Sequence, residues 1–405
     1  MGAHEVIVVG AGPAGAVTGL LLARRGHGVL LLDKATFPRD KPCAEYLSPE
    51  INVLLARLGL RTAVEAARPA RLRGFIIVPP GGRPFRGDFA PDGPRGYGLA
   101  LPRTTLDALL VERARAAGVT VREGFRVGDL LREGGRVVGV RGRQRGRRDE
   151  EELRAPVTVG ADGLHSVVAG RLGLARRPAA RAPGPQVLAL VTHLAGIARL
   201  GDYGEMHVAP GCYVGVAPLG GDLANVALVV PLAEGPAVAG RREEYFRAAL
   251  GRFPLLAGRL DGARLAKPLL AVGPLAARAR RYSAGGALLL GDAARFYDPF
   301  TGEGIYRALR GGELASEVIA AALAAGDVSA RALARFDREY RAAFAGKYLV
   351  ERVVHEIVTR PRLFDHVARR LARKAGLADR LVGVTGDYLP PRTVLTPGYL
   401  VRLFL

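Results

Sequence analysis

The chain of 405 residues has no tryptophan and only two cysteines, Cys43 and Cys212, which lie far apart in the sequence. Two distant cysteines exclude a disulfide framework and a CxxC zinc pattern, and the seven histidines show no HExxH or similar ligand spacing. We therefore expect no metal site and a reducing, cytoplasmic environment.

Long apolar runs are also missing. Leu20–Ala23 and Ile319–Ala325 fall short of the roughly 20 residues that a membrane helix needs, and the acidic Glu5 stands where a signal peptide would be apolar. The C-terminal Tyr399–Leu405 mixes apolar residues with Arg402. We favour a helix docked on the core for this segment, with peripheral contact to the inner face of a membrane as the alternative.

Acidic residues are scarce relative to basic ones: 38 Asp and Glu against 59 Lys and Arg give a net charge of +21. The basic residues are nearly all arginine and are scattered along the chain. This pattern indicates a bias in composition rather than a polyanion surface, so no nucleic-acid partner is expected.

Two styles of secondary structure alternate along the chain. Residues 5–9, 13–25 and 29–33 predict a strand, a helix and a strand of a parallel βαβ unit, and a later helix over 104–117 is predicted to start with Thr104 as its N-cap. Closely spaced strands between 187 and 230, with 71–78 and 96–101, predict an antiparallel sheet. From residue 287 the pattern again predicts a strand of a parallel sheet, followed by a helix.

These patterns predict an α/β fold (α+β overall). A Rossmann-like, discontinuous dinucleotide-binding domain (residues 1–70, 102–180 and 285–345) would carry an inserted antiparallel β-sheet substrate domain (71–101 and 181–284). A helical C-terminal region (346–405) would follow.

A GxGxxG motif stands directly after the first predicted strand. Gly10 permits the tight turn, Gly12 lets the backbone approach a pyrophosphate, and Gly15 lets helix and strand pack closely. The helix that follows offers free N–H groups to the phosphates. Asp33 ends the second strand at the spacing of a carboxylate that binds ribose hydroxyls. The motif predicts dinucleotide binding.

Two further turns place an aspartate beside a glycine at the end of an apolar strand. They are Asp162-Gly163 and Gly291-Asp292, and the second continues into Asp298–Ile305 (DPFTGEGI). Such carboxylates can accept hydrogen bonds from cofactor hydroxyls, and the glycines give close access to the backbone. Taken singly, each is equally well an ordinary turn.

Together the three motifs resemble the glutathione-reductase-like FAD fold of the aromatic-hydroxylase type. More closely, Phe37–Glu45 (FPRDKPCAE), Asp298–Ile305 and the tail Asp379–Leu405 are similar to the geranylgeranyl reductase family of FAD-dependent oxidoreductases, although Ala44 replaces a glycine frequent there. The resemblance covers essentially the whole chain and implies FAD. The motif positions expected to hold it are Gly10, Gly12, Pro13, Ala14, Gly15, Asp33, Lys34, Arg103, Val127, Asp162, Gly291, Asp292, Gly302, Gly304 and Ile305.

The family resemblance also implies a reaction, the reduction of isolated C=C bonds of a prenyl or isoprenoid lipid by hydride from reduced flavin. Cys43, in a loop expected to fold over the flavin, is the candidate catalytic residue, and a role in lining the pocket or pinning the loop is the equal alternative. We expect the substrate pocket to include Glu45, Tyr213, Gly215, Ala217 and Pro299, although sheet packing explains the alternating face of 213–217 equally well. Candidate proton donors are His165, His207 and Tyr306, for which ordinary structural roles are favoured.

The sequence leaves four points open. One GxGxxG motif leaves the reductant as NAD(P)H that docks transiently or a protein electron donor. The alternative enzyme is a flavin monooxygenase that acts on an apolar or aromatic substrate through a C4a-hydroperoxide, whereas the lack of tryptophan argues against a halogenase. A non-enzymatic basic protein that binds nucleic acid or membranes would purify without yellow colour. The oligomeric state is open.

Overall fold

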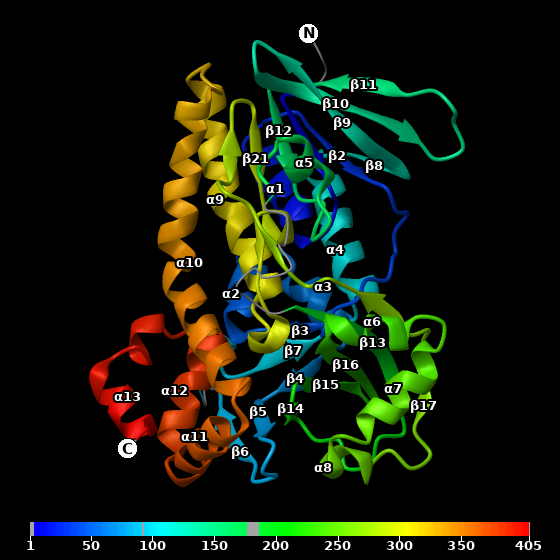
Figure 1. The fold of residues 1–405 in the computed structure, drawn as a ribbon. Helices are drawn as coiled ribbons and strands as arrows, with labels where there is room; N and C mark the ends of the chain where they lie inside the picture. The colour runs from blue at the N-terminus through cyan, green and yellow to red at the C-terminus, as the bar shows by residue number, and fades with distance from the viewer. Residues whose placement is uncertain (1–3, 91–92, 176–185, 405) are drawn as a thin grey trace.

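The computed structural model describes residues 4–90, 93–175 and 186–404. Its first layer is a six-stranded sheet with the order β20-β21-β12-β1-β2-β8, in the upper half of Figure 1. The bounds are β1 Val6–Val9, β2 Val29–Asp33, β8 Thr120–Glu123, β12 Val157–Gly160, β20 Ser283–Ala284 and β21 Ala287–Leu289. All pairs are parallel except β20 with β21. The predicted α/β fold is confirmed.

Helix α1 (Pro13–Ala23) is buried against this sheet and contacts α4 (Arg103–Ala116) and α9 (Gly304–Ala324). Nearly every residue of α1 is buried, which is why its sequence is apolar on all faces. Beyond the sheet, β9 (Phe125–Glu133), β10 (Arg136–Gln144) and β11 (Glu151–Arg154) form a separate antiparallel sheet.

The second layer is an eight-stranded sheet with the order β17-β13-β16-β15-β14-β5-β6, to which β18 adds beside β13. The bounds are β5 Gly74–Val78, β6 Phe85–Asp88, β13 Val187–Ala195, β14 Gly204–Ala209, β15 Cys212–Gly220, β16 Leu223–Pro231, β17 Arg264–Leu265 and β18 Leu270–Val272. It is not purely antiparallel as predicted, because β5 enters from a distant segment and pairs in parallel with β14.

The strand predicted over 96–101 also differs. It is β7 (Gly98–Ala100), which pairs with β3 (Tyr46–Leu47) and β4 (Ala70–Leu72) in a separate small sheet. The remaining short elements are α2 Pro49–Arg57, α3 Arg61–Ala66, α5 Val167–Arg171, α6 Gly235–Val238, α7 Arg242–Leu250, α8 Pro254–Ala257, β19 Ala277–Arg278 and β22 Arg295–Phe296.

The C-terminal part is helical, as Figure 1 shows, with the long α10 (Ala330–Val358) running along one side of the molecule. Helices α11 (Pro361–Arg373), α12 (Ala375–Thr385) and α13 (Pro397–Phe404) follow it. The predicted boundary at residue 346 falls inside the continuous α10, and the one at 180/181 lies outside the described residues. In the described ranges, no helix combines the length and the apolar character needed to cross a membrane.

Both faces of the eight-stranded sheet are covered. On β13, Leu188 and Leu190 pack into a core with α7 and α8, whereas Ala189 and Val191 face the core formed with α10 to α13. Alternating side chains of this strand therefore belong to two different hydrophobic cores, one on each face of the sheet. The first layer meets the second layer around one cavity, and the C-terminal helices meet the second layer around another.

Candidate active site

A cavity of about 1240 Å³ lies where the loops after the parallel strands meet the eight-stranded sheet. Position at the carboxyl ends of parallel strands is where open α/β sheets bind ligands. Most of the predicted site residues contribute to its wall. They are Gly12, Pro13, Ala14, Cys43, Glu45, Arg103, Gly291, Asp292, Pro299, Gly302, Gly304 and Ile305.

The glycine-rich turn has the shape of a phosphate cradle. Gly10 has φ +101°, and a Cβ added there would lie 2.4 Å from the carbonyl oxygen of Ala161. A Cβ on Gly15 would lie 1.9 Å from the carbonyl oxygen of Gly10. Gly12, by contrast, faces the cavity, and the nearest atom to a Cβ there is Nη2 of Arg39 at 3.4 Å. The backbone at the start of α1 is thus open to a diphosphate.

Basic side chains converge on this cradle. Arg39 and Arg103 share the buried carboxylate of Asp107, at 2.9 and 2.7 Å, so the cluster keeps one excess positive charge. Burial would lower the pKa of Arg103, but the charge of Asp107 raises it above its ordinary value. Lys41 Nζ lies 4.0 Å from Asp292 at the cavity wall. These cations fit the diphosphate of a dinucleotide, and Arg39 is a contributor that the sequence analysis did not assign.

Besides Gly10 and Gly15, which shape the turn, four predicted cofactor residues lie outside the wall. Asp33 is buried and accepts hydrogen bonds from the N–H groups of Ala11 and Ala35 at 2.8 Å. Lys34 is exposed, and Val127 is buried in the core. Asp162 accepts from Ser166 Oγ at 2.5 Å and from the N–H of Val167 at 2.7 Å, so its carboxylate caps α5.

The loop that carries Cys43 is fastened to the rest of the site by Glu45. This residue has φ +58°, is 1% exposed, and accepts hydrogen bonds from His193 Nε2 at 2.6 Å and Asn225 Nδ2 at 3.0 Å. Burial alone would raise the pKa of Glu45, but the hydrogen bond and charge of His193 lower it, assisted by the backbone of Arg103. A positive φ in a non-glycine residue persists only where its surroundings impose it.

Glu45 also explains one wrong prediction. Helix α4 begins at Arg103 after Pro102, without a side-chain cap from Thr104. The N–H of Arg103 instead donates to Oε1 of Glu45 at 3.0 Å. The carboxylate that caps the start of α4 therefore lies 58 positions away in the sequence, whereas we expected the cap to come from Thr104. Within the loop, Cys43 Sγ accepts from the N–H of Glu45 at 3.3 Å.

The sheet side of the cavity is built from strands other than the one predicted. Small side chains of β13 and β16 line it, namely Ala189, Val191, Ala227 and Val229. Tyr213, on the neighbouring β15, instead donates its hydroxyl to Asp298 at 2.6 Å. Gly215 faces Met206, and Ala217 packs in a cluster with Tyr46. The side chains predicted on β15 therefore lie on the same side of the sheet as the lining residues of β13 and β16. They lie next to the cavity wall and are not part of it.

The candidate proton donors differ in position. His165 is exposed, and His207 bonds to Glu205 on β14, where both are buried. Tyr306 follows the cavity-lining Ile305 on α9, and burial raises the pKa of its hydroxyl to about 12. Glu303, which precedes α9, also lines the cavity and was not singled out from the sequence.

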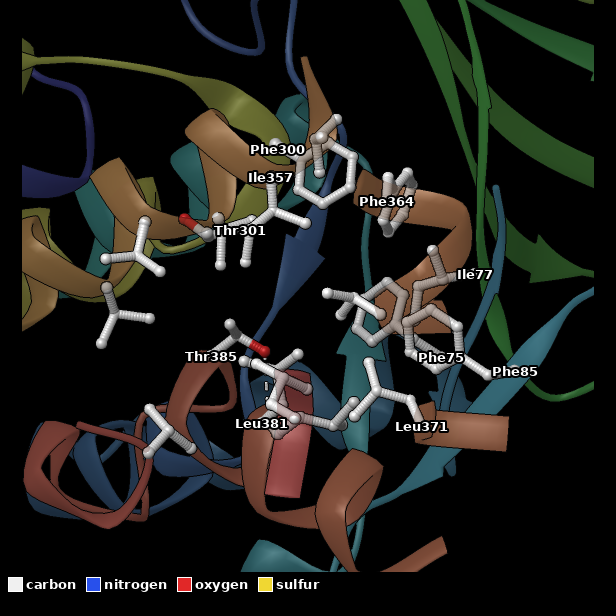
Figure 2. A pocket seen from close by; sticks show the side chains of 18 of the residues that line it. Phe75, Ile77, Phe85, Phe300, Thr301, Ile357, Phe364, Leu371, Leu381 and Thr385 are labelled. Atoms are coloured by element: carbon white, nitrogen blue, oxygen red, sulfur yellow. Dashed lines mark hydrogen bonds between the residues drawn. The ribbon is translucent and has the colours of Figure 1, made fainter. Parts of the chain in front are cut away.

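A second cavity, of about 920 Å³, lies beside the first, between β5, β6 and the helices α10 to α13. Figure 2 shows its wall, to which Phe75, Ile77, Phe364, Leu371 and Leu381 contribute apolar side chains. Phe300 and Thr301 also line this cavity, whereas their neighbours Pro299 and Gly302 line the first one. One short turn, Pro299–Thr301, therefore stands between the two spaces.

Comparison with known proteins places the chain in a family. Residues 3–349 match the family described as FAD binding domain. The chain is 32% identical over 337 residues to the digeranylgeranylglycerophospholipid reductase of Methanosarcina mazei, which covers 80% of this chain and 77% of that protein. The chain belongs to the geranylgeranyl reductase family of FAD-dependent oxidoreductases. The resemblance predicted from the sequence is confirmed.

Solved structures agree on the fold of this family member. A geranylgeranyl bacteriochlorophyll reductase-like protein from Thermoplasma acidophilum is similar with a TM-score of 0.76 and 22% identity, covering 99% of this chain and 95% of that chain. The myxobacterial chondrochloren halogenase is similar with a TM-score of 0.81 and 24% identity, covering 97% and 99%. At these identities the similarity concerns the fold, which oxidoreductases of different reactions share.

Proposed function

We propose that this FAD-dependent oxidoreductase reduces isolated C=C bonds of a prenyl lipid. The observation that supports it best is the apolar lining of the second cavity, which adjoins the cofactor cavity across the Pro299–Thr301 turn. Its wall is almost wholly aliphatic and aromatic. Its polar side chains include Tyr399, which donates to the carbonyl of Leu377, and Thr385, which donates to that of Val382. Such a wall suits a hydrocarbon chain, each buried CH₂ contributing about 0.8 kcal/mol.

The residues around the first cavity would hold the cofactor in the following way. Gly12 and the start of α1 would receive the diphosphate, with Arg39 and Arg103 beside it. Gly304, the first residue of α9, would offer its backbone N–H to the ring system at the positive end of that helix. Gly302, whose N–H donates to the carbonyl of Pro299, would leave space for the ring to approach. When bound and reduced, FAD supplies a hydride at N5. The small side chains of β13 and β16 leave room opposite it for an alkene and exclude water.

The proposal also covers the electron donor and the place from which the substrate is taken. GxGxxG occurs once in a strand–turn–helix context, so NAD(P)H would dock transiently or a protein would donate the electrons. A lipid substrate would be drawn from the inner face of a membrane. Helix α13 is docked through its buried Tyr399 and Leu403, while Val401 is 54% exposed on its outer side.

Anaerobic turnover tests the proposed reaction. Protein loaded with FAD and reduced with dithionite is mixed with a geranylgeranyl lipid, and the product is analysed by mass spectrometry. A gain of two hydrogens per reduced double bond, together with reoxidation of the flavin, is expected. Lipid that returns unchanged, with substrate-dependent oxygen consumption in the presence of NAD(P)H, would instead identify the monooxygenase alternative.

A further inference from the structure

A group of five charged side chains is buried behind the start of α9. It comprises two cations and three carboxylates from α9, α10 and the turn after α12, each at most 8% exposed: Glu303, Arg307, Lys347, Glu351 and Asp387. Arg307 and Glu351 form a bidentate ion pair at 3.1 and 3.2 Å. Lys347 Nζ lies 2.5 Å from Oδ1 of Asp387 and 3.4 Å from Oε1 of Glu303.

The charges of this buried group do not balance. After Arg307 and Glu351 neutralise each other, Lys347 faces two carboxylates. An uncompensated charge away from water costs several kcal/mol, which binding of one proton removes. Asp387 is the closer partner of Lys347, so the proton belongs on Glu303. The Oε2 atom of Glu303 is buried and has no hydrogen-bond partner among the described residues, as is also true of both carboxylate oxygens of Asp387. Of the two residues, however, only Glu303 lines the cavity.

The other carboxyl groups at the cavity wall have different surroundings. Glu45 accepts hydrogen bonds from His193, Asn225 and the N–H of Arg103. Asp298 accepts from Tyr213, His355 and the N–H of Phe300. The side chain of Asp292 is 30% exposed. Among these carboxyl groups, Glu303 is the one that is buried against a cation and has an oxygen without a hydrogen-bond partner among the described residues.

We propose that Glu303 is the proton donor of the reaction, a role that rests on the proposed function. As hydride adds to one alkene carbon, the O–H bond of the Glu303 carboxyl group breaks and a C–H bond forms at the other carbon. The carboxylate that remains lies 3.4 Å from Lys347 and leaves the buried group with a net negative charge, which a proton from water removes after the product leaves. The reductant is the reduced flavin, which loses the hydride.

The titration of Glu303 matches this role. Burial raises its pKa to about 8, opposed by Lys347 and reinforced by Asp387, so the acid is largely protonated at neutral pH. The groups that face it are Arg307 and Tyr306 on α9, Lys347 and Glu351 on α10, Asp387 after α12, and Tyr46 on β3. A general acid whose pKa lies near the working pH is protonated before the reaction and still transfers its proton readily.

Glu303→Gln is the first test, because it keeps the size of the side chain and removes the acid. The rate at which a prenyl alkene reoxidises dithionite-reduced flavin should fall by about 10²- to 10⁴-fold, while FAD affinity and reduction by dithionite stay unchanged. The wild-type rate should decrease as pH rises through the pKa of Glu303, and the residual rate of the variant should not. Glu313→Gln is the control, since Glu313 lies on the same helix but pairs with Arg57 and Arg310.

A second readout needs neither substrate nor flavin. The infrared difference spectrum between wild type and Glu303→Gln should contain the C=O band of a protonated carboxylic acid, which disappears as pH rises. The absence of that band, or a variant that reoxidises its flavin at the wild-type rate, overturns the assignment. If the band is present but wild-type protein leaves every prenyl alkene unreduced, the proposed function fails, and the donor role with it.

Discussion

The second and third glycines of the GxGxxG turn, Gly12 and Gly15, should respond differently when each is replaced by alanine. At Gly15 the added Cβ would lie 1.9 Å from the carbonyl oxygen of Gly10 and 3.1 Å from Val8 Cγ1. Ordinary contact is near 3.5 Å, so the start of α1 would have to move by about 1.5 Å. It cannot do so freely, because α1 is buried between the sheet and α9. We expect Gly15→Ala to lower the free energy of unfolding by about 1–3 kcal/mol or more.

Gly12→Ala is the matched change. Gly12 has φ −71°, which alanine adopts without strain, and the nearest atom to its Cβ would be the flexible end of Arg39 at 3.4 Å. The free energy of unfolding of the protein without cofactor should therefore stay within about 0.5 kcal/mol of wild type. The methyl group, however, would stand where the diphosphate approaches. A steric cost of about 1–3 kcal/mol corresponds to a loss of about 10- to 100-fold in FAD affinity.

Urea unfolding of the cofactor-free proteins and titration with FAD, followed by flavin fluorescence, measure the two effects separately. The reasoning is refuted if Gly15→Ala unfolds like wild type, or if Gly12→Ala binds FAD with wild-type affinity. Loss of stability in Gly12→Ala would also contradict it, since the structure shows open space at that Cβ apart from Arg39.

Three further outcomes are expected. Cys43→Ala should keep FAD but slow single-turnover alkene reduction by at least about tenfold, and a wild-type rate would leave Cys43 a packing role. Glu45→Gln should destabilise the protein at neutral pH, because folding lowers the pKa of Glu45. The difference in unfolding free energy between wild type and variant should reach its full value above about pH 4.5 and shrink as pH falls below it. A difference that does not change with pH would contradict the ion pair with His193. Val354→Trp, which fills the apolar cavity, should slow reduction of long prenyl chains more than short ones in a competition assay without changing FAD affinity, whereas Val401→Trp on the exposed side of α13 should change neither.

The sequence was sufficient for features that depend on neighbouring residues. The first strand, turn, helix and second strand were predicted within two residues of β1, α1 and β2, because the apolar periods and the glycine positions are local signals. The three cofactor turns were found for the same reason. Residues from all three turns line one cavity, with Gly12, Gly163 and Asp292 among them.

Contacts that depend on tertiary structure were not predictable. Alternation along 213–217 defines a face of β15, but the sheet order that sets β13 and β16 against the cavity depends on distant pairings. Glu303 meets Lys347 44 positions later, across a helix boundary. The cap that α4 receives from Glu45 likewise spans 58 positions. A glutamate between two glycines, directly before a predicted helix, is the local signal that could have drawn attention to Glu303.

The Pro299–Thr301 turn has a consequence for protein engineering. The walls on its two sides come from different parts of the chain: mostly residues before 309 surround the cofactor space, whereas mostly residues after 349 surround the apolar one. If the proposed prenyl substrate occupies the apolar space, exchanging α11 to α13 between relatives should change the preferred chain length while the flavin compartment is left intact. A chimera of this kind must retain Asp387, since its contact with Lys347 crosses the junction.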